Sequence, residues 1–142
     1  MAGYFTKLNG RVYEGEYVAG EELANGVFVS ITANGVKKLT AAGDAEFVID
    51  EKTTLWGAPA VRMHCAYEGT KDAFLVENEI EDYGDRDLNG ALYTVPAGHY
   101  VKMRAPEKGD QIIITVDSTT YAALAVGDTV KPASGGGVAK KS

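Results

Sequence analysis

Short strand-like runs separated by closely spaced turn signals restrict the fold of this 142-residue chain more than any other feature. The turn signals include four Asn-Gly pairs: Asn9-Gly10, Asn25-Gly26, Asn34-Gly35 and Asn89-Gly90. Asn-Gly favours a type I′ hairpin turn, because both of its residues tolerate positive φ. Short strands joined at this spacing are typical of an all-β sandwich or a small β-barrel, and we predict one of these two folds.

Alternating hydrophobicity locates the individual strands. The run from Ala60 to Glu68 alternates apolar and polar side chains, as a half-buried strand does. Its apolar side carries Val61, Met63, Cys65 and Tyr67. A second run places Val27, Val29 and Ile31 on one face. The β-branched run from Asp110 to Asp117 suits a strand that is buried on both faces.

One short helix is predicted late in the chain, where Ser118 or Thr119 caps a turn that continues through Leu124 before Gly127 ends it. We expect a β-rich core domain over residues 21–132. Residues 1–20 form either an N-terminal arm or the first hairpin of that core. Residues 133–142 are rich in glycine and small side chains, which predicts a flexible C-terminal tail.

Charge and cysteine content exclude several classes of protein. The net charge of −6 and the pI near 4.9 argue against nucleic acid as the main partner. Cys65 is the single cysteine, so neither an internal disulfide nor a cysteine-rich zinc site can form. The chain lacks an apolar run of about 18 residues and the layout of a signal peptide. We therefore expect synthesis in a cytoplasm and no membrane partner.

The negative charge is concentrated between Glu68 and Asp87, where eight acidic residues stand against Lys71 and Arg86. Eight minus two equals the net charge of the whole chain, −6. The favoured interpretation is a solvated face, and the alternatives are a patch for a basic partner or for cations.

The segment from Asp85 to Pro96 partly matches a calcium-binding loop. Oxygen ligands stand at alternate positions, followed by a glycine: Asp85, Asp87, Asn89 and Gly90. The twelfth position is Pro96 where the calcium loop requires a bidentate Glu. We favour a polar hairpin loop around Asn89-Gly90, with a weak Ca²⁺ site, helped by Asp82, as the alternative. No other cofactor is expected.

The sequence shows neither a catalytic motif nor a set of zinc ligands. His64 and His99 are the only histidines, and with one cysteine they do not make up a zinc ligand set. We expect His64 at the surface of its strand and Cys65 as a small buried side chain. Nucleophile-elbow, P-loop, dinucleotide-binding and zinc-protease motifs are all missing from the sequence, so we predict that the chain is not an enzyme.

Aromatic side chains are the best candidates for binding another protein. Five are candidate interface residues: Tyr4, Phe5, Tyr13, Tyr17 and Trp56. Tyrosine and tryptophan combine a large apolar surface with a polar group, which suits interface anchors. For Trp56, a position in the core or at a barrel mouth is the favoured alternative.

Two stretches resemble one another, from Leu23 to Lys38 and from Leu124 to Lys141. Leu, Ala, Gly and Val recur at one spacing: Leu23/Leu124, Ala24/Ala125, Gly26/Gly127 and Val29/Val130. No helix is predicted directly after either glycine, so neither copy is a phosphate-binding loop. We interpret the repeat as a structural device in which leucine enters the core and glycine makes a turn that opens a hairpin.

Three stretches, residues 3–31, 51–63 and 121–141, resemble small bacteriophage capsid decoration proteins, also called cement or head fibre-like proteins. The resemblance implies a non-enzymatic β-rich domain, often trimeric, which binds the outside of an assembled capsid and bridges major capsid protein subunits. It implies location on the virion exterior and carries over no site residue. The alternatives are a tail or baseplate β-structural module, or a small β-barrel carbohydrate- or ion-binding domain that uses Trp56 or the Asp85–Asn89 loop.

Overall fold

The computed structural model describes residues 3–7, 10–55, 57–77 and 94–141. The strands in this part of the chain are β1 (Gly3–Lys7), β2 (Val12–Tyr13), β3 (Leu23–Ala24), β4 (Phe28–Thr32), β5 (Gly35–Lys38), β6 (Glu46–Leu55), β7 (Ala58–Tyr67), β8 (Phe74–Val76), β9 (Thr94–Val95), β10 (Met103–Arg104), β11 (Gln111–Thr115), β12 (Thr129–Pro132) and β13 (Val138–Lys140). The helix α2 (Ser118–Ala123) is the one helix within these ranges.

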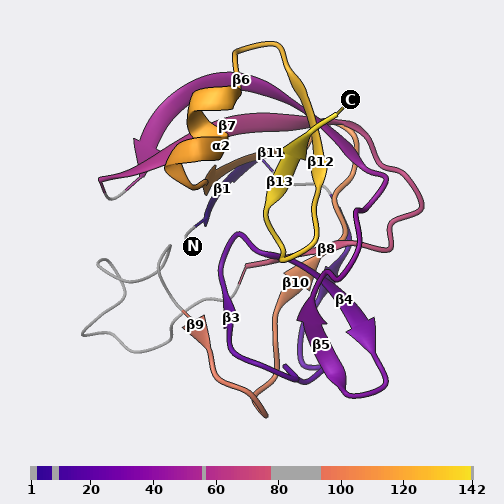
Figure 1. Ribbon diagram of the computed structural model, residues 1–142. Coiled ribbons are helices and arrows are strands. Elements are labelled where there is room, and N and C mark those ends of the chain that lie inside the picture. Colours follow the sequence, from indigo (N-terminus) through magenta and orange to yellow (C-terminus); the bar gives the residue numbers. More distant parts are fainter. Residues whose placement is uncertain (1–2, 8–9, 56, 78–93, 142) are drawn as a thin grey trace.

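The strands form three antiparallel sheets (Figure 1). A six-stranded sheet has the order β1-β11-β7-β6-β12-β13, a five-stranded sheet the order β2-β10-β8-β4-β5, and β3 pairs with β9. The all-β prediction is confirmed. The barrel alternative is not, because none of the three sheets closes on itself in the described part of the chain.

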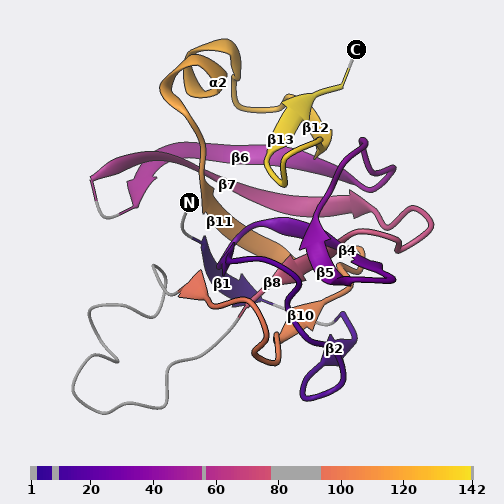
Figure 2. The same cartoon turned by 60° about the horizontal axis from the view of Figure 1, so that its bottom comes forward.

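The two large sheets pack against each other around a first core (Figure 2). Phe47, Met63 and Ile112 enter it from the six-stranded sheet, and Phe28 and Leu75 from the five-stranded sheet. The Phe28 and Phe47 rings lie 5.5 Å apart between their centroids. Alternate residues of each strand therefore fill one apolar layer, as in a β-sandwich.

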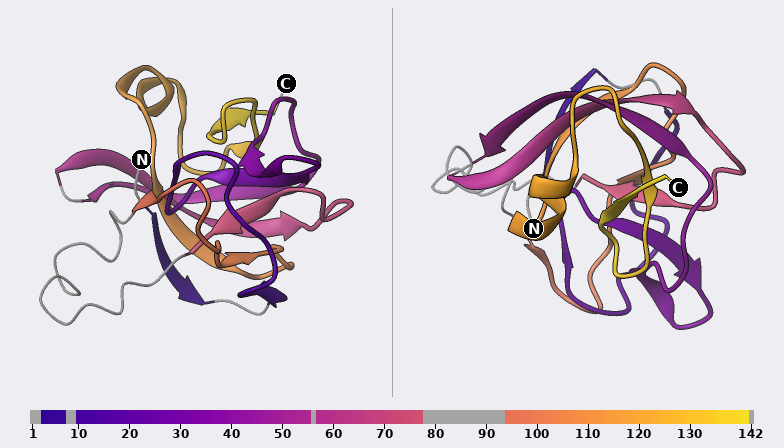
Figure 3. Two further views of the ribbon diagram at one scale, coloured as in Figure 1. Left: turned by 90° about the horizontal axis from the view of Figure 1, so that it is seen from below. Right: turned by 45° about the horizontal axis from the view of Figure 1, so that its top comes forward.

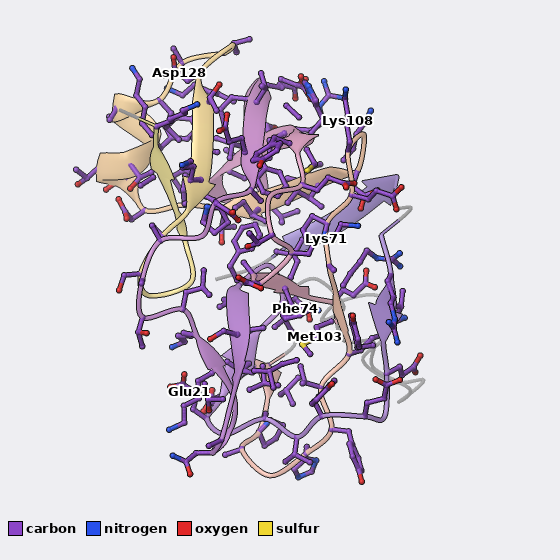
Figure 4. The ribbon with its side chains drawn as sticks, turned by 90° about the vertical axis from the view of Figure 1, so that its right-hand side faces the viewer. Glu21, Lys71, Phe74, Met103, Lys108 and Asp128 are labelled. Atoms are coloured by element: carbon purple, nitrogen blue, oxygen red, sulfur yellow. The ribbon has the colours of Figure 1, made fainter. Side chains whose placement is uncertain are left out.

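A second core covers the other face of the five-stranded sheet. All three residues of β8 are buried, with Leu75 in the first core and Phe74 and Val76 in the second. Figure 4 shows Phe74 next to Met103, which belongs to the same second core. Leu23, Ala19, Val95 and Val101 close this core from outside. The five-stranded sheet is thus the middle layer of three, and the outer layer is the ribbon β3–β9 with its neighbouring segments.

The long hairpin β6–β7 confirms the alternation predicted for Ala60 to Glu68, with one exception. Val61, Met63 and Cys65 are buried, but Tyr67 is 55% exposed. The register shifts because Phe47 pairs with Cys65 while Glu46 pairs with Tyr67. Ala66 is therefore the extra residue of a β-bulge, which reverses the side on which the next residue lies.

The face predicted for Val27, Val29 and Ile31 is correct only for the two valines. Both valines belong to the second core, whereas Ile31 is 41% exposed. β8 pairs with β4 only at Phe28 and Val29, so Ile31 extends past the edge of the neighbouring strand. On β11, Ile112 and Ile114 are buried and Ile113 is only partly covered, so this strand is not buried equally on both faces.

The turns at Asn25-Gly26 and Asn34-Gly35 are not of type I′. Gly26 and Gly35 have φ of 82° and 99°, but Lys71 is the one non-glycine residue with positive φ within the described ranges. The β4–β5 hairpin closes with Thr32 opposite Gly35, so the turn residues are Ala33 and Asn34. Asn9 and Asn89-Gly90 lie outside the described residues.

The short helix forms where the sequence predicts it, but its cap is one residue earlier. Asp117 is the N-cap, and its carboxylate accepts a hydrogen bond of 2.7 Å from the Thr120 amide. Leu124 ends the helix and is buried in the first core. The helix lies beside β7, and the chain then returns through β12 to pair with β6 (Figure 3).

Both copies of the repeat use leucine, glycine and valine in the same way. The leucines Leu23 and Leu124 and the valines Val29 and Val130 are all buried. The two glycines, Gly26 and Gly127, have φ of 82° and 93°. Each glycine amide donates a hydrogen bond to a neighbouring strand, to Val76 or to Ile49. These observations agree with a structural device.

The C-terminal segment is not the flexible tail that its composition predicts. β13 pairs with β12, and Val138 is buried in the first core. The Gly135 amide donates to the Leu39 carbonyl at 2.7 Å, and the Phe28 amide donates to the Gly136 carbonyl at 2.8 Å. A Cβ on Gly136 would collide with the Val27 side chain. The glycines therefore allow close packing of backbone against β4.

The front of the chain is neither a free arm nor a hairpin. β1 pairs with β11 at the edge of the six-stranded sheet, whereas β2 pairs with β10 at the edge of the five-stranded sheet. The front of the chain thus contributes one short strand to each of the two large sheets. Among the described residues, no helix is long and apolar enough to cross a membrane.

Candidate protein-binding site

The outer layer carries a small apolar surface made by two residues from distant parts of the chain. Val18 and Tyr100 form an antiparallel β-bridge and are 38% and 62% exposed. Their neighbours Ala19 and Val101 are buried in the second core. Because successive side chains of an extended chain alternate in direction, Val18 and Tyr100 project together to the outside. We call this pair the Val18–Tyr100 surface.

Hydrogen bonds hold this surface in place on two sides. The Ala19 amide donates to the His99 carbonyl at 2.8 Å, and the Gly98 amide donates to the Ala19 carbonyl at 2.8 Å. On the other side, the Val36 amide donates to the Val18 carbonyl at 2.9 Å. The outer layer is therefore bonded directly to the turn at residues 96–99 and to β5. These three segments lie together at the lower end of the molecule in Figure 1.

An aromatic cluster packs against the second core, to which Ala19 and Val101, the chain neighbours of Val18 and Tyr100, belong. The rings of Tyr13 and Tyr17 lie 6.0 Å apart, and Tyr13 meets Phe74 edge-on at 5.3 Å between centroids. The Arg11 guanidinium carbon lies 4.6 Å from the centroid of the Tyr13 ring. These contacts hold the Tyr13 and Tyr17 rings against the second core.

A glycine lies close to each of the two residues in the chain. Gly20 is two residues after Val18, and Gly98 is two residues before Tyr100. Gly98 has φ of 87°, which favours glycine at this turn.

Charges of both signs border the surface. Segments 11–22 and 96–102 carry four glutamates, Glu14, Glu16, Glu21 and Glu22, and two cations, Arg11 and Lys102, while the adjoining β5 adds Lys37 and Lys38. Glu21 accepts a hydrogen bond of 2.8 Å from the Lys38 amide. The other three glutamates are exposed, and none of them is in an ion pair with a residue that the structure describes.

The structure brings together two of the five predicted interface residues. Tyr13 and Tyr17 lie side by side and pack against the second core. Tyr4 and Phe5 belong to β1 in the other large sheet, where they pair with Ile113 and Ile112. Trp56 lies outside the described residues, as do Asp82, Asp85, Asp87 and Asn89 of the possible calcium loop.

Sequence reasoning missed Val18 and Tyr100. Each stands in a short alternating run, and each has a buried neighbour on the C-terminal side. That pattern predicts exposure of both, but it does not show that they are adjacent. Their adjacency depends on a pairing between two distant segments.

His64 and Cys65 do not combine into a catalytic site. His64 Nδ1 lies 2.8 Å from Asp50 Oδ1 on the partly exposed face of the six-stranded sheet. Cys65 is on the opposite face and 1% exposed, and burial raises the pKa of its thiol to about 11. A protonated thiol behind the sheet cannot act as the nucleophile for this histidine. The described residues contain no cluster of three or more His, Cys, Asp or Glu able to hold a metal.

A shallow cavity of about 460 Å³ lies between the loops at residues 39–44 and 70–73. The carboxylates of Asp44 and Asp72, which line this cavity, hold the loop at residues 70–73 in place. Asp44 accepts hydrogen bonds from the amide and hydroxyl of Thr70 at 3.0 and 3.1 Å, and Asp72 accepts one from the same hydroxyl at 2.9 Å. The Thr70 amide holds the pKa of Asp44 below its usual value. We assign these groups a structural role in the turn.

Comparisons with protein-family models, with curated proteins and with solved structures find no match to this chain. Function must therefore be inferred from the residues of the chain itself.

Proposed function

We propose that this chain is a non-enzymatic capsid decoration protein, which binds the outer surface of an assembled phage capsid and stabilises it by bridging major capsid protein subunits. The observation that carries the proposal is the Val18–Tyr100 surface, an exposed apolar pair whose chain neighbours Ala19 and Val101 are buried in the second core. Interface energy is usually concentrated in a few such anchors. The resemblance of residues 3–31, 51–63 and 121–141 to decoration proteins points to the same function.

The form of the fold also supports a binding role. A decoration protein needs a rigid body that presents one surface, and here two cores share the five-stranded sheet. The surface is small, so its single-site affinity is modest. Many copies on one capsid, and the trimer that the resemblance implies, compensate for a modest affinity through multivalency.

The test is co-sedimentation of the purified chain with assembled phage capsids that lack it. We expect the chain to sediment with these capsids and to raise their melting temperature in calorimetry. As a control, the Val126→Ser variant should sediment with the capsids as the wild type does. Val126 is 63% exposed, but it lies on the turn after α2, away from the Val18–Tyr100 surface. Wild-type chain that stays in the supernatant contradicts the proposal, and sedimentation with tails instead of heads favours the tail-module alternative.

A further inference from the structure

We infer that Asn34 is a site of spontaneous deamidation, and that its conversion to isoaspartate loosens the attachment of residues 18–20 to β5. The inference does not rest on the proposed function, because the reaction needs only the folded chain and water. The sequence Ala-Asn-Gly-Val occurs twice in the chain, at residues 24–27 and at residues 33–36. Since the two copies are identical, a difference in their reactivity must come from the fold.

The reaction takes place within an Asn-Gly pair. The glycine backbone nitrogen loses its proton and attacks the side-chain carbonyl carbon of the asparagine, which closes a succinimide ring and expels the side-chain nitrogen as ammonia. Water then opens the ring at one of its two carbonyl carbons. The product is aspartate or isoaspartate, and the isoaspartate backbone runs through the former side chain and is one methylene longer. Glycine favours the attack because it has no side chain to hinder it.

The copy at residues 33–36 is open to this reaction. Asn34 is exposed in the turn between β4 and β5, and none of the residues that the structure describes hydrogen-bonds to its side-chain amide. The Thr32 hydroxyl accepts a hydrogen bond of 3.1 Å from the Asn34 backbone amide and donates one of 2.6 Å to the Gly35 carbonyl. These two bonds hold backbone groups of the turn and leave the Asn34 side chain in water.

The copy at residues 24–27 is protected. Asn25 is 2% exposed, and Gly26 is buried as well. The Gly26 amide, which would supply the attacking nitrogen, donates a hydrogen bond of 3.0 Å to the Val76 carbonyl. Deamidation of Asn25 therefore requires local unfolding first, and the free energy of that opening lowers its rate.

Isoaspartate at position 34 would disturb the contact between this turn and residues 18–20. The Val36 amide donates to the Val18 carbonyl at 2.9 Å, and the Gly20 amide donates to the Val36 carbonyl at 2.8 Å. A Cβ on Gly20 would collide with the Asn34 carbonyl, so the two backbones touch at this point. In isoaspartate that carbonyl becomes a charged carboxylate and the adjacent backbone is longer. The close contact cannot accommodate either change, so we expect the two hydrogen bonds of Val36 to weaken.

The site is tested by holding the folded chain at mildly alkaline pH while peptide mass spectrometry follows the conversion of each asparagine to an acid. We expect Asn34 to react at least about a hundredfold faster than Asn25. In urea the two should react at similar rates, because their local sequences are identical. A protein isoaspartate methyltransferase identifies the isoaspartate product. Asn34→Gln is the control and should give no acid at this position, since its longer side chain closes a ring slowly.

Amide hydrogen exchange tests the structural consequence. In the chain that carries isoaspartate, the Gly20 and Val36 amides should exchange at least about tenfold faster than in fresh chain. Asn34→Asp introduces a negative charge without lengthening the backbone, and it should leave both exchange rates unchanged.

Equal rates at Asn25 and Asn34 in the folded chain would overturn the site, as would a folded chain in which neither residue reacts although both react in urea. Exchange at Gly20 and Val36 that stays at the rate of fresh chain would overturn the consequence, as would Asn34→Asp with the same acceleration as isoaspartate. None of these measurements involves a capsid, so failure of this inference is distinguishable from failure of the proposed function.

Discussion

The C-terminal segment from Thr129 to Lys141 and the front segment from Arg11 to Glu22 both secure the five-stranded sheet, but they do so with opposite residue types. The C-terminal segment brings glycine backbone against β4 and the residue after β5, and its Val138 enters the first core. The front segment brings tyrosine rings against the second core and leaves Val18 exposed.

The difference shows how composition misleads about order. A glycine-rich segment is expected to be loose, yet here the lack of side chains lets two backbones approach within hydrogen-bonding distance. An aromatic segment is expected to lie wholly in the core or wholly at an interface. In the front segment, however, successive side chains point in opposite directions, so Tyr17 packs against the second core while Val18 is exposed. The C-terminal segment therefore contributes stability, and the front segment contributes both stability and a surface.

The largest expected effect comes from breaking a buried ion pair next to the front segment, since Arg104 of β10 lies opposite Val12 of β2. The Arg104 guanidinium pairs with the Glu77 carboxylate at 3.0 Å and donates to the Gly10 carbonyl at 2.6 Å. Arg104→Met leaves a buried carboxylate without its cation, and we expect a loss of about 4 kcal/mol in urea unfolding. Adding Glu77→Leu removes that charge and should restore most of the loss. A double variant as unstable as Arg104→Met would show that the ion pair is not the cause.

A smaller effect is expected from Gly136→Ala in the C-terminal segment. Gly135 and Gly136 have φ of 92° and 91°, so alanine is equally strained at either position. Only at Gly136 does the new methyl group meet Val27 and the Phe28 carbonyl. We expect losses of about 1 kcal/mol for Gly135→Ala and about 3 kcal/mol for Gly136→Ala in the free energy of unfolding. Equal losses would mean that this segment does not pack closely on β4.

The smallest effect concerns the turn that leads into the C-terminal segment. The Asp128 carboxylate accepts a hydrogen bond from the Ala125 amide at 2.9 Å and lies 3.4 Å from Lys140 Nζ, and both interactions lower its pKa. A lowered pKa in the folded state stabilises the protein above the ordinary value of 3.8, and this contribution is lost as the pH falls through the lowered pKa.

Asp128→Ala should therefore lower the melting temperature slightly at pH 7, and the difference from wild type should shrink as the pH falls below 3.8. Scanning calorimetry across this range measures it. Lys140→Met separates the contribution of the cation from that of the amide. A difference that stays constant down to pH 2 would show that the ionised carboxylate is not responsible.

The sequence predicts those parts of the fold that depend on residues near one another in the chain. The strand at Ala60 to Glu68, the helix near Ser118 and the glycine turns of the repeat all follow from local patterns. The face of the sheet on which Tyr67 lies does not follow from a local pattern, because the bulge at Ala66 depends on how β7 pairs with β6. The order of the C-terminal segment does not either, because it depends on contacts with β4.

The candidate site divides in the same way. Tyr13 and Tyr17 stand out in the sequence as aromatic residues close together, and the structure packs both against the second core. The surface itself requires that residue 18 pair with residue 100, which no local pattern predicts. Periodicity indicates which residues face outward, and only the topology shows which of them meet.

The hydrogen bonds of residues 18–20 have a mechanical consequence. Val18 and Gly20 bond to Val36 on one side, and Ala19 bonds to the turn at residues 98–99 on the other. A load that pulls along this segment must break hydrogen bonds on both flanks, whereas an edge segment is bonded on one flank alone. Force applied to residues 18–20 is therefore shared between two neighbouring segments.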